Sequence, residues 1–147
     1  MPLTVRPTTE ADFDAWKLLY LGYGVFYKRE MTEQTLATVW GWLMDPAHVL
    51  EGLVAERDGA LVGLAHFREM PSPLRAQPVG FLDDMFVDPD ARGAKVGEAL
   101  FAELERITAA RGWPVLRWLT ADDNYRARVL YDRIGKKTSW NLYEMTP

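Results

Sequence analysis

One stretch of the chain, residues 82–104, combines residue types that can bind an anion. It reads LDDMFVDPDARGAKVGEALFAEL: an apolar strand with two adjacent acids, a turn of small residues over 92–97, and an amphipathic helix. Free N–H groups at a helix N-terminus point outward, and the helix dipole favours negative charge. The pattern predicts a phosphate site at the turn, although small residues also occur at ordinary loop-to-helix junctions.

The two adjacent acids, Asp83 and Asp84, could take part in proton transfer. Successive side chains of a strand point to opposite faces, so this spacing predicts that one of the two faces a cleft. A carboxylate there can accept a proton from a bound group, directly or through water. The alternative is that both acids are solvated at a strand edge, which fits at least one of them.

Periodicity and chain breakers predict the elements that position these residues. The first half should hold a strand over 3–6, a helix from Thr8 or Thr9 that Gly22 and Gly24 interrupt, a helix over 32–44, and strands over 48–56 and 60–68 joined at Asp58-Gly59. The second half should hold a surface loop over 70–78, a strand over 79–87, a helix over 94–111, a strand over 115–120, a short helix ending at Ile134 and a strand over 139–145.

The order of these elements predicts an α/β fold. A helix connects the strands at 79–87 and 115–120, and such a crossover joins parallel strands. The earlier strands form an antiparallel run. We therefore expect a mixed, mostly antiparallel sheet with helices on both faces, in one domain spanning residues 1–147.

Composition narrows the possible partners. The net charge of −4 disfavours binding to nucleic acid, which depends on basic side chains. The absence of Cys excludes disulfides and a Cys nucleophile, and His48 and His66 stand too far apart for metal-ligand spacing, so no metal is expected. Without a signal pattern or an apolar run of membrane-spanning length, we expect a soluble cytoplasmic protein.

Two motifs together resemble the GNAT superfamily of N-acetyltransferases. The turn at 92–97 is similar to the family pattern Q/R-x-x-G-x-G/A, except that Lys95 stands where the middle Gly is usual. Downstream, 124–131 matches N-x-x-A-x-x-L-Y. The strand acids look like those of spermidine/spermine acetyltransferases, and the later motifs look more like the Hpa-type enzymes that acetylate histones and D-amino acids.

The resemblance implies acetyl-coenzyme A as co-substrate. The residues that it assigns to the coenzyme are Met85, Phe86, Val87, Arg92, Gly93, Ala94, Lys95, Val96, Gly97, Asn124 and Tyr131. Met85 and Val87 would act through backbone amides left free where the parallel strands diverge. Lys95 would adopt a backbone conformation that the family usually gives to Gly, or the turn would differ slightly. Asn124 is equally well explained as a helix cap.

The resemblance also implies roles in the chemistry. Asp83 would act as the base, and Tyr131 as the acid that protonates the departing thiolate. Asp84 would hold the substrate ammonium, and Tyr27 is a candidate for lining the acceptor pocket with Tyr20, Tyr23, Phe26 and Trp40. The competing explanation for these aromatic residues, Tyr131 included, is packing, since Tyr131 lies in an apolar helical stripe.

These residues predict acetyl transfer to the primary amine of a small molecule, an amino acid or a polyamine, by direct attack in a ternary complex. The alternative acceptor is a protein lysine, as in a histone tail. A non-catalytic acyl-coenzyme A sensor would need neither Asp83 nor Tyr131, and a nucleotide-phosphate binder would need a Gly-Lys-Ser/Thr turn that is absent here. Homodimers are common among similar proteins, which is the basis for expecting one.

Overall fold

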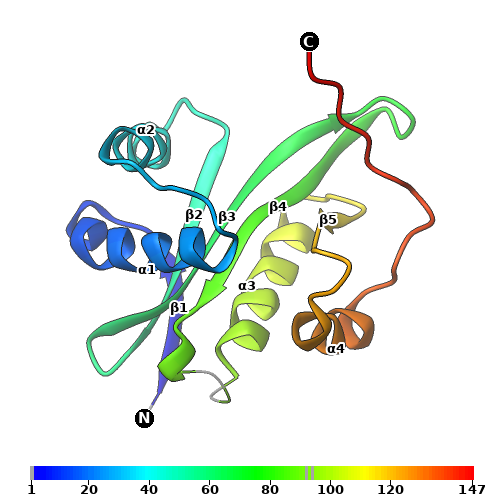
Figure 1. The fold of residues 1–147 in the computed structure, drawn as a ribbon. Coiled ribbons are helices and arrows are strands. Elements are labelled where there is room, and N and C mark those ends of the chain that lie inside the picture. The colour runs from blue at the N-terminus through cyan, green and yellow to red at the C-terminus, as the bar shows by residue number, and fades with distance from the viewer. Residues whose placement is uncertain (1, 92, 94) are drawn as a thin grey trace.

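The computed structural model describes residues 2–91, 93 and 95–147, and its framework is one mixed five-stranded sheet. The strands are β1 (Leu3–Pro7), β2 (Leu50–Arg57), β3 (Ala60–Ser72), β4 (Gln77–Val87) and β5 (Leu116–Trp118), in that spatial order (Figure 1). The first four strands pair antiparallel, and β5 pairs parallel to β4. The predicted α/β class and the mostly antiparallel sheet are confirmed.

Helices cover both faces of the sheet, and each face has its own core. On one face α1 (Phe13–Phe26) and α2 (Glu33–Met44) pack on the sheet around the buried residues Trp16, Leu36, Leu64 and Phe86. On the other face α3 (Val96–Ala110) packs around Leu53, Ala65, Leu82, Leu100 and Leu104. α4 (Tyr125–Ile134) follows β5 and lies beside α3 (Figure 1). Short 3-10 helices at Glu10–Asp12 and Pro89–Ala91 precede α1 and α3.

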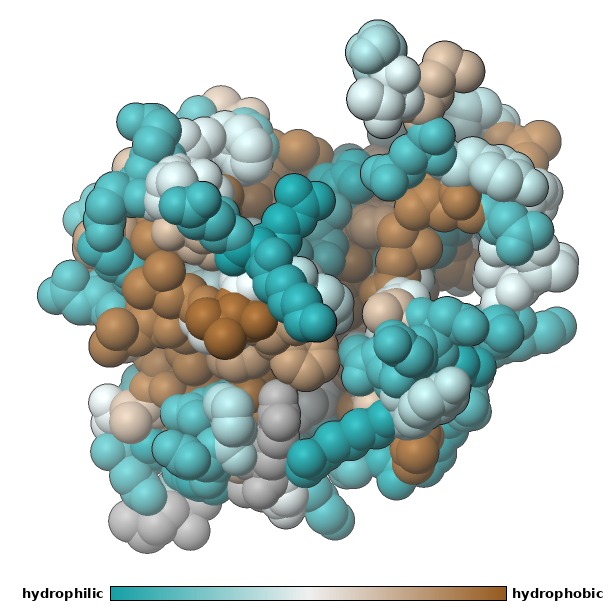
Figure 2. Space-filling model, viewed as in Figure 1, coloured by the Kyte–Doolittle hydropathy of each residue, from teal (hydrophilic) through white to brown (hydrophobic). Residues whose placement is uncertain are grey.

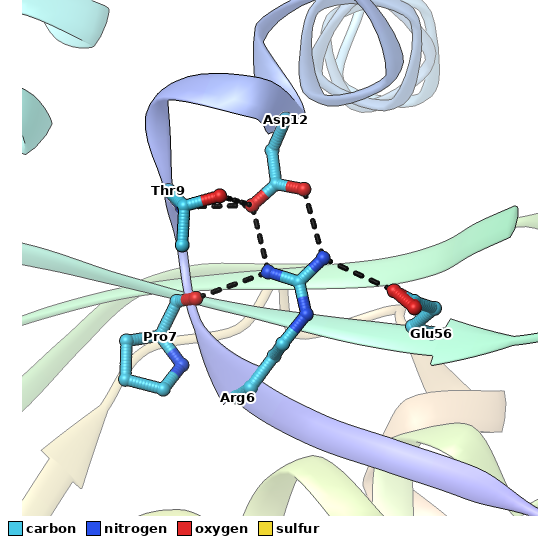
Figure 3. Close-up of polar contacts among 5 residues, drawn as sticks. All are labelled: Arg6, Pro7, Thr9, Asp12 and Glu56. Carbon is cyan, nitrogen blue, oxygen red and sulfur yellow. Dashed lines mark hydrogen bonds and ion pairs between the residues drawn. The ribbon is translucent and has the colours of Figure 1, made fainter. Parts of the chain in front are cut away.

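A charged cluster fixes the start of α1 to the sheet (Figure 3). The guanidinium of Arg6 on β1 donates to both carboxylate oxygens of Asp12 at 2.8 and 2.9 Å, and to Glu56 of β2 at 3.1 Å. Asp12 also accepts a hydrogen bond from the backbone amide of Thr9 at 2.7 Å. The Arg6 hydrogen bonds lower the pKa of Asp12 despite its burial. This network fixes the start of α1, the helix that carries Tyr20, Tyr23 and Phe26, against the sheet.

The predicted break in α1 at Gly22 and Gly24 is wrong, because the helix continues to Phe26. Gly24 has a different function: a Cβ there would lie 2.5 Å from the Cγ atom of Met31. The chain reverses over this glycine, with Lys28 at φ 55° and the Arg29 amide donating to the Gly24 carbonyl at 2.8 Å. This is a Schellman-type helix end, in which a left-handed residue satisfies the last carbonyls.

The predicted surface loop over 70–78 is also largely strand. β3 and β4 extend into it, leaving a turn at 73–76. The prolines suggested a loop because proline has no N–H to donate. Pro71 and Pro78 are directly opposite each other in the ladder, so neither strand needs an N–H from the other at this pair.

The predicted strand over 139–145 is absent, and no strand follows α4 in the described part of the chain. The segment instead exposes its large apolar side chains, with Trp140 80%, Leu142 69%, Tyr143 89% and Met145 93% exposed. A strand requires a partner strand, and β5, the edge strand after β4, spans only three residues. None of the described helices is both long enough and apolar enough to cross a membrane.

Candidate active site

A β-bulge in β4 determines where the two acids point. Asp84 is paired with His66, but the next pair along β3 is Phe67 with Leu82, so Asp83 is an extra residue. Such a bulge reverses the alternation of side chains beyond it. Leu82 accordingly packs in the α3 core, whereas Phe86, an even number of residues later, packs in the α1 core.

Both Asp83 and Asp84 therefore lie on the α1 face, and both line the same pocket. Simple alternation predicted opposite faces, and that prediction is wrong because of the bulge. The sequence signal for a bulge was weak, since neither residue is a glycine.

Asp84 sits in a hydrogen-bonded network that is largely buried. Its Oδ2 atom is 2.9 Å from His66 Nδ1 and accepts a hydrogen bond from the Tyr20 hydroxyl at 2.9 Å. Burial alone would raise the pKa of Asp84, but hydrogen bonds from His66, Tyr23 and Tyr20 outweigh it and lower that pKa. Asp84 is therefore a carboxylate at neutral pH, and it remains 19% exposed to the pocket.

The other side of His66 fixes its tautomer. The indole N–H of Trp16 donates to His66 Nε2 at 2.9 Å, so this nitrogen must be an acceptor. The ring proton is then on Nδ1 and is donated to Asp84. Trp16 and His66 are 0% and 1% exposed, so this chain of donors is shielded from water and holds Asp84 in one orientation.

The pocket beside Asp84 has a volume of about 290 Å³. Its lining comes from α1, α2, the start of β2, β3 and β4: Tyr20, Val39, Trp42, His48, Val49, Leu50, Arg68, Asp83 and Asp84. Asp83 accepts a hydrogen bond from Arg68 Nε at 2.9 Å. The walls are largely apolar, and the ionised groups are confined to the floor formed by β3 and β4.

A row of tyrosines connects this pocket to α4. Along α1 the rings of Tyr20 and Tyr23 lie 5.5 Å apart and those of Tyr23 and Tyr27 lie 4.8 Å apart. Burial raises the pKa of Tyr131 on α4, and the nearby Tyr27 raises that pKa further. Figure 2 shows the surface hollowed between the part that carries α1 and the part that carries α4.

β4 and β5 separate at the bulge. Their pairing ends at Leu82 with Trp118, so β4 has no strand partner on the β5 side from Asp83 to Val87 among the described residues. The Gly80 amide donates to Val115 on the β5 side, and the Asp88 amide donates to Val62 on the β3 side. Amides an even number apart point the same way in a regular strand, so the bulge accounts for this reversal.

The same reversal sets the direction of two further amides. Beyond the bulge, the N–H groups of Met85 and Val87 point to the open β5 side, because the Asp88 amide points to β3. Unpaired backbone amides in a cleft are free to bind a ligand. Phe86, assigned to the same group from the sequence, instead buries its side chain in the α1 core.

The turn before α3 has the backbone conformation that the sequence predicted. Gly93 has φ 89° and Lys95 has φ 61°, so Lys95 adopts the left-handed conformation that favours glycine. α3 begins at Val96, and a Cβ on Gly97 would lie 3.5 Å from Leu130 of α4, so the first turn of α3 packs close to α4. Arg92 and Ala94 lie outside the described residues.

Tyr131 and Asn124, the two residues predicted to act at α4, have different surroundings. Tyr131 packs against Phe101 and Trp118, with ring centroids 5.8 and 5.5 Å away, and is half-buried. Asn124 precedes α4, but its side chain donates to Thr120 at 3.2 Å and does not cap the helix. Packing and an active role are compatible for Tyr131, because the side chain is only half-buried.

Comparison with known proteins identifies this arrangement. Residues 13–135 match the model of the acetyltransferase (GNAT) family. The chain belongs to this family. It is an acetyl-transfer enzyme, as the resemblance implied.

Named relatives of this GNAT enzyme act on amines. This chain is 28% identical over 144 residues to the D-amino-acid N-acetyltransferase HPA3 of Saccharomyces cerevisiae. The match covers 97% of this chain and 89% of the relative. The chain is also 32% identical over 114 residues to aminoglycoside N(6')-acetyltransferase type 1 of Stenotrophomonas maltophilia, covering 74% of this chain and 69% of the relative.

The fold agrees with that of a solved acetyltransferase. The structure of AAC(6')-Iy in complex with the bisubstrate analog CoA-S-monomethyl-acetylneamine superposes with a TM-score of 0.84 at 18% identity. The match covers 100% of this chain and 99% of that one. The likeness extends over the whole sheet and both helical layers.

Four residues of this GNAT enzyme's pocket network were not assigned a role from the sequence: His66, Arg68, Trp42 and His48. Trp42 lies outside the buried face of α2 and is 43% exposed. A large aromatic side chain that is exposed on a helix is a sequence signal for a binding site. By contrast, Trp40 packs in the core between Phe13 and Trp16. Phe26 is 49% exposed and does not line the pocket.

Proposed function

We propose that this acetyltransferase moves an acetyl group from acetyl-coenzyme A to the primary amine of a small molecule. The observation that carries the proposal is the position of Asp84. It lies on the floor of the pocket and at one end of the tyrosine row that reaches toward Tyr131. A carboxylate in the pocket and a phenol beyond the far end of the tyrosine row would supply the two proton transfers that amide formation needs.

The coenzyme fits the open side of β4. The amides of Met85 and Val87 point into the gap between β4 and β5 and can donate to the amide groups of a pantetheine arm. Next to this gap, the turn containing Gly93 and Lys95 leads into the N-terminus of α3, which favours a pyrophosphate. AAC(6')-Iy, which shares this fold, has been solved with a bisubstrate analog that contains coenzyme A, which supports the choice of this ligand.

The reaction balances without a covalent enzyme intermediate. The amine nitrogen attacks the thioester carbonyl, a C–N bond forms, and the C–S bond breaks. Backbone amides can stabilise the developing oxyanion. The departing thiolate takes a proton from Tyr131, whose phenol is protonated at neutral pH like that of an ordinary tyrosine.

The structure changes which of the two aspartates we propose as the group that binds and deprotonates the amine. The resemblance gave Asp83 the base role, but its carboxylate is paired with Arg68 and lies farther along β4 from Met85. Asp84 is oriented by His66 and Tyr20 and is ionised, so it can hold the ammonium and accept its proton through water. We therefore propose Asp84 for base and ammonium-binding duty, with Tyr20 and Tyr27 lining the approach.

Incubation with labelled acetyl-coenzyme A tests the proposal. Panels of amino acids, polyamines, aminoglycosides and lysine peptides would be compared by transfer of label. We expect transfer to a small amine and little to peptides, because the pocket of about 290 Å³ is bounded by α2 and the start of β2. Coenzyme binding without transfer to any amine would favour the sensor instead, and preference for peptides would favour a protein acceptor.

We also propose a homodimer built on the C-terminal segment. The supporting observation is that Trp140, Leu142, Tyr143 and Met145 are largely exposed, which is unusual for four large apolar side chains in nine residues. Pairing with a second copy would bury them. A variant ending at residue 138 should then be a monomer by light scattering, whereas the full chain is a dimer.

A further inference from the structure

We propose that Arg68 binds a carboxylate of the acceptor, and that the acceptor is therefore an amino acid and not a polyamine. This inference rests on the proposed function, because it concerns the same pocket. It is carried by the way in which β3 and the bulge of β4 place one guanidinium and two carboxylates on one pocket floor.

Arg68 is held in place while much of its guanidinium stays available. Its Nε donates to Asp83 at 2.9 Å, and the guanidinium carbon lies 4.9 Å from the centre of the Phe81 ring. Among the described side chains, Arg68 donates a hydrogen bond to Asp83, and it does so through Nε. The two Nη groups of a guanidinium form a planar fork that matches a carboxylate, and here the fork is oriented before the ligand arrives.

The charges in the pocket match a zwitterion. Asp83 is already partnered by Arg68, so Asp84 is the carboxylate left to attract an ammonium. An amino acid brings one ammonium for Asp84 and one carboxylate for the Arg68 fork. A diamine would bring a second cation for which no carboxylate is left, because Asp83 is already paired with Arg68.

The remaining walls fit an apolar side chain. Trp42 of α2 and His48 before β2 are stacked, with ring centroids 5.1 Å apart and planes 3° apart. Together with Val39, Val49 and Leu50 they form the wall opposite the ionised floor. Flat rings and aliphatic groups bury apolar surface well, so the preferred amino acids should carry an apolar or aromatic side chain.

The test compares substrates that differ only in the carboxylate. Phenylalanine, phenylalaninamide and phenylethylamine are assayed with acetyl-coenzyme A, using the native chain and Arg68→Gln. We expect the native enzyme to favour phenylalanine over phenylethylamine at least about tenfold in kcat/KM. This is the effect of one good charge-assisted contact between the substrate carboxylate and Arg68. Arg68→Gln should lose that preference by a rise in KM for phenylalanine that phenylethylamine does not share. Arg75→Gln, an exposed arginine in the turn between β3 and β4, is the charge-matched control.

The outcomes separate this inference from the proposed function. No transfer to any amine, with coenzyme still bound, would overturn the proposed function itself. Transfer to phenylethylamine as good as to phenylalanine, or an equal loss of both substrates in Arg68→Gln, would overturn the inference alone. If Arg68→Gln fails to fold by circular dichroism, Arg68→Lys decides: it keeps the charge but lacks the fork, so an unchanged preference would count against Arg68.

Discussion

The two sides of the cleft differ in how complete they are. On the acceptor side, Asp84, His66, Trp16 and Tyr20 form a closed set of hydrogen bonds in a buried setting. On the coenzyme side, β5 has three residues, α4 has no fully buried residue, and the segment after it is exposed. On the proposed function, the acceptor side is built in advance and the coenzyme side gains contacts when its ligand binds.

This division has a physical basis. A small acceptor offers few contacts, so groups that are already oriented spare it the cost of ordering the site. A coenzyme offers a long arm and several phosphate oxygens, so it can supply hydrogen bonds to amides that the protein leaves unpaired. The same open backbone would be costly if it were buried without a ligand.

The largest effect should come from the centre of the acceptor side. Asp84→Asn removes the charge that holds the ammonium and the group that accepts its proton, so kcat/KM should fall on the order of 10³-fold. Coenzyme affinity, measured by calorimetry, should stay the same because the carboxylate points to the α1 face. Asp58→Asn in the β2–β3 turn is the control. A loss of less than tenfold would show that Asp84 is not the base.

The next effect tests the coenzyme side. Tyr131→Phe removes the proton donor but keeps the ring that packs on Phe101 and Trp118, so kcat should fall by about 10²-fold. Coenzyme affinity should change little. Tyr125→Phe, an exposed tyrosine on the same helix, is the matched control. Unchanged turnover would remove Tyr131 from the chemistry.

A smaller effect is expected from the support of Asp84. Trp16→Phe leaves His66 Nε2 buried without its donor, which should lower the free energy of unfolding by about 1–3 kcal/mol. It also frees His66 to take the other tautomer, so the pH profile of kcat/KM should change shape as Asp84 loses its fixed donor. Leu74→Ala, at 90% exposure in the turn between β3 and β4, should change neither quantity. A stability loss with an unchanged pH profile would mean that Trp16 has a packing role only.

The sequence predicted the framework well because periodicity and breakers act locally. The crossover helix, the parallel pair β4–β5 and the Asp58-Gly59 turn are confirmed. The left-handed Lys95 also followed from one residue that departs from the family pattern. These features depend on neighbours within a few positions.

The errors came from interactions between distant segments. The bulge at Asp83 is a property of how β3 and β4 pair, and neither strand shows it alone. His66 acquires its role from Trp16, 50 positions earlier, and Arg68 from Asp83, 15 positions later. The expected strand over 139–145 has the right alternation but no described partner, so a local pattern was correct about propensity and wrong about structure.

The smallest effect separates backbone from side chain at the turn before α3. Lys95→Gly removes a left-handed non-glycine residue that costs roughly 1 kcal/mol, while glycine loses a similar amount through unfolded-chain entropy. If the amide of residue 95 contacts the phosphate, coenzyme affinity should change by less than about threefold, under 1 kcal/mol. Lys28→Gly is a close control, since Lys28 has φ 55° at the end of α1, on the opposite face of the sheet from α3. A tenfold loss of affinity in Lys95→Gly but not in Lys28→Gly would show that the ammonium of Lys95 binds the coenzyme, and the coenzyme side would then be more preorganised than its open backbone suggests.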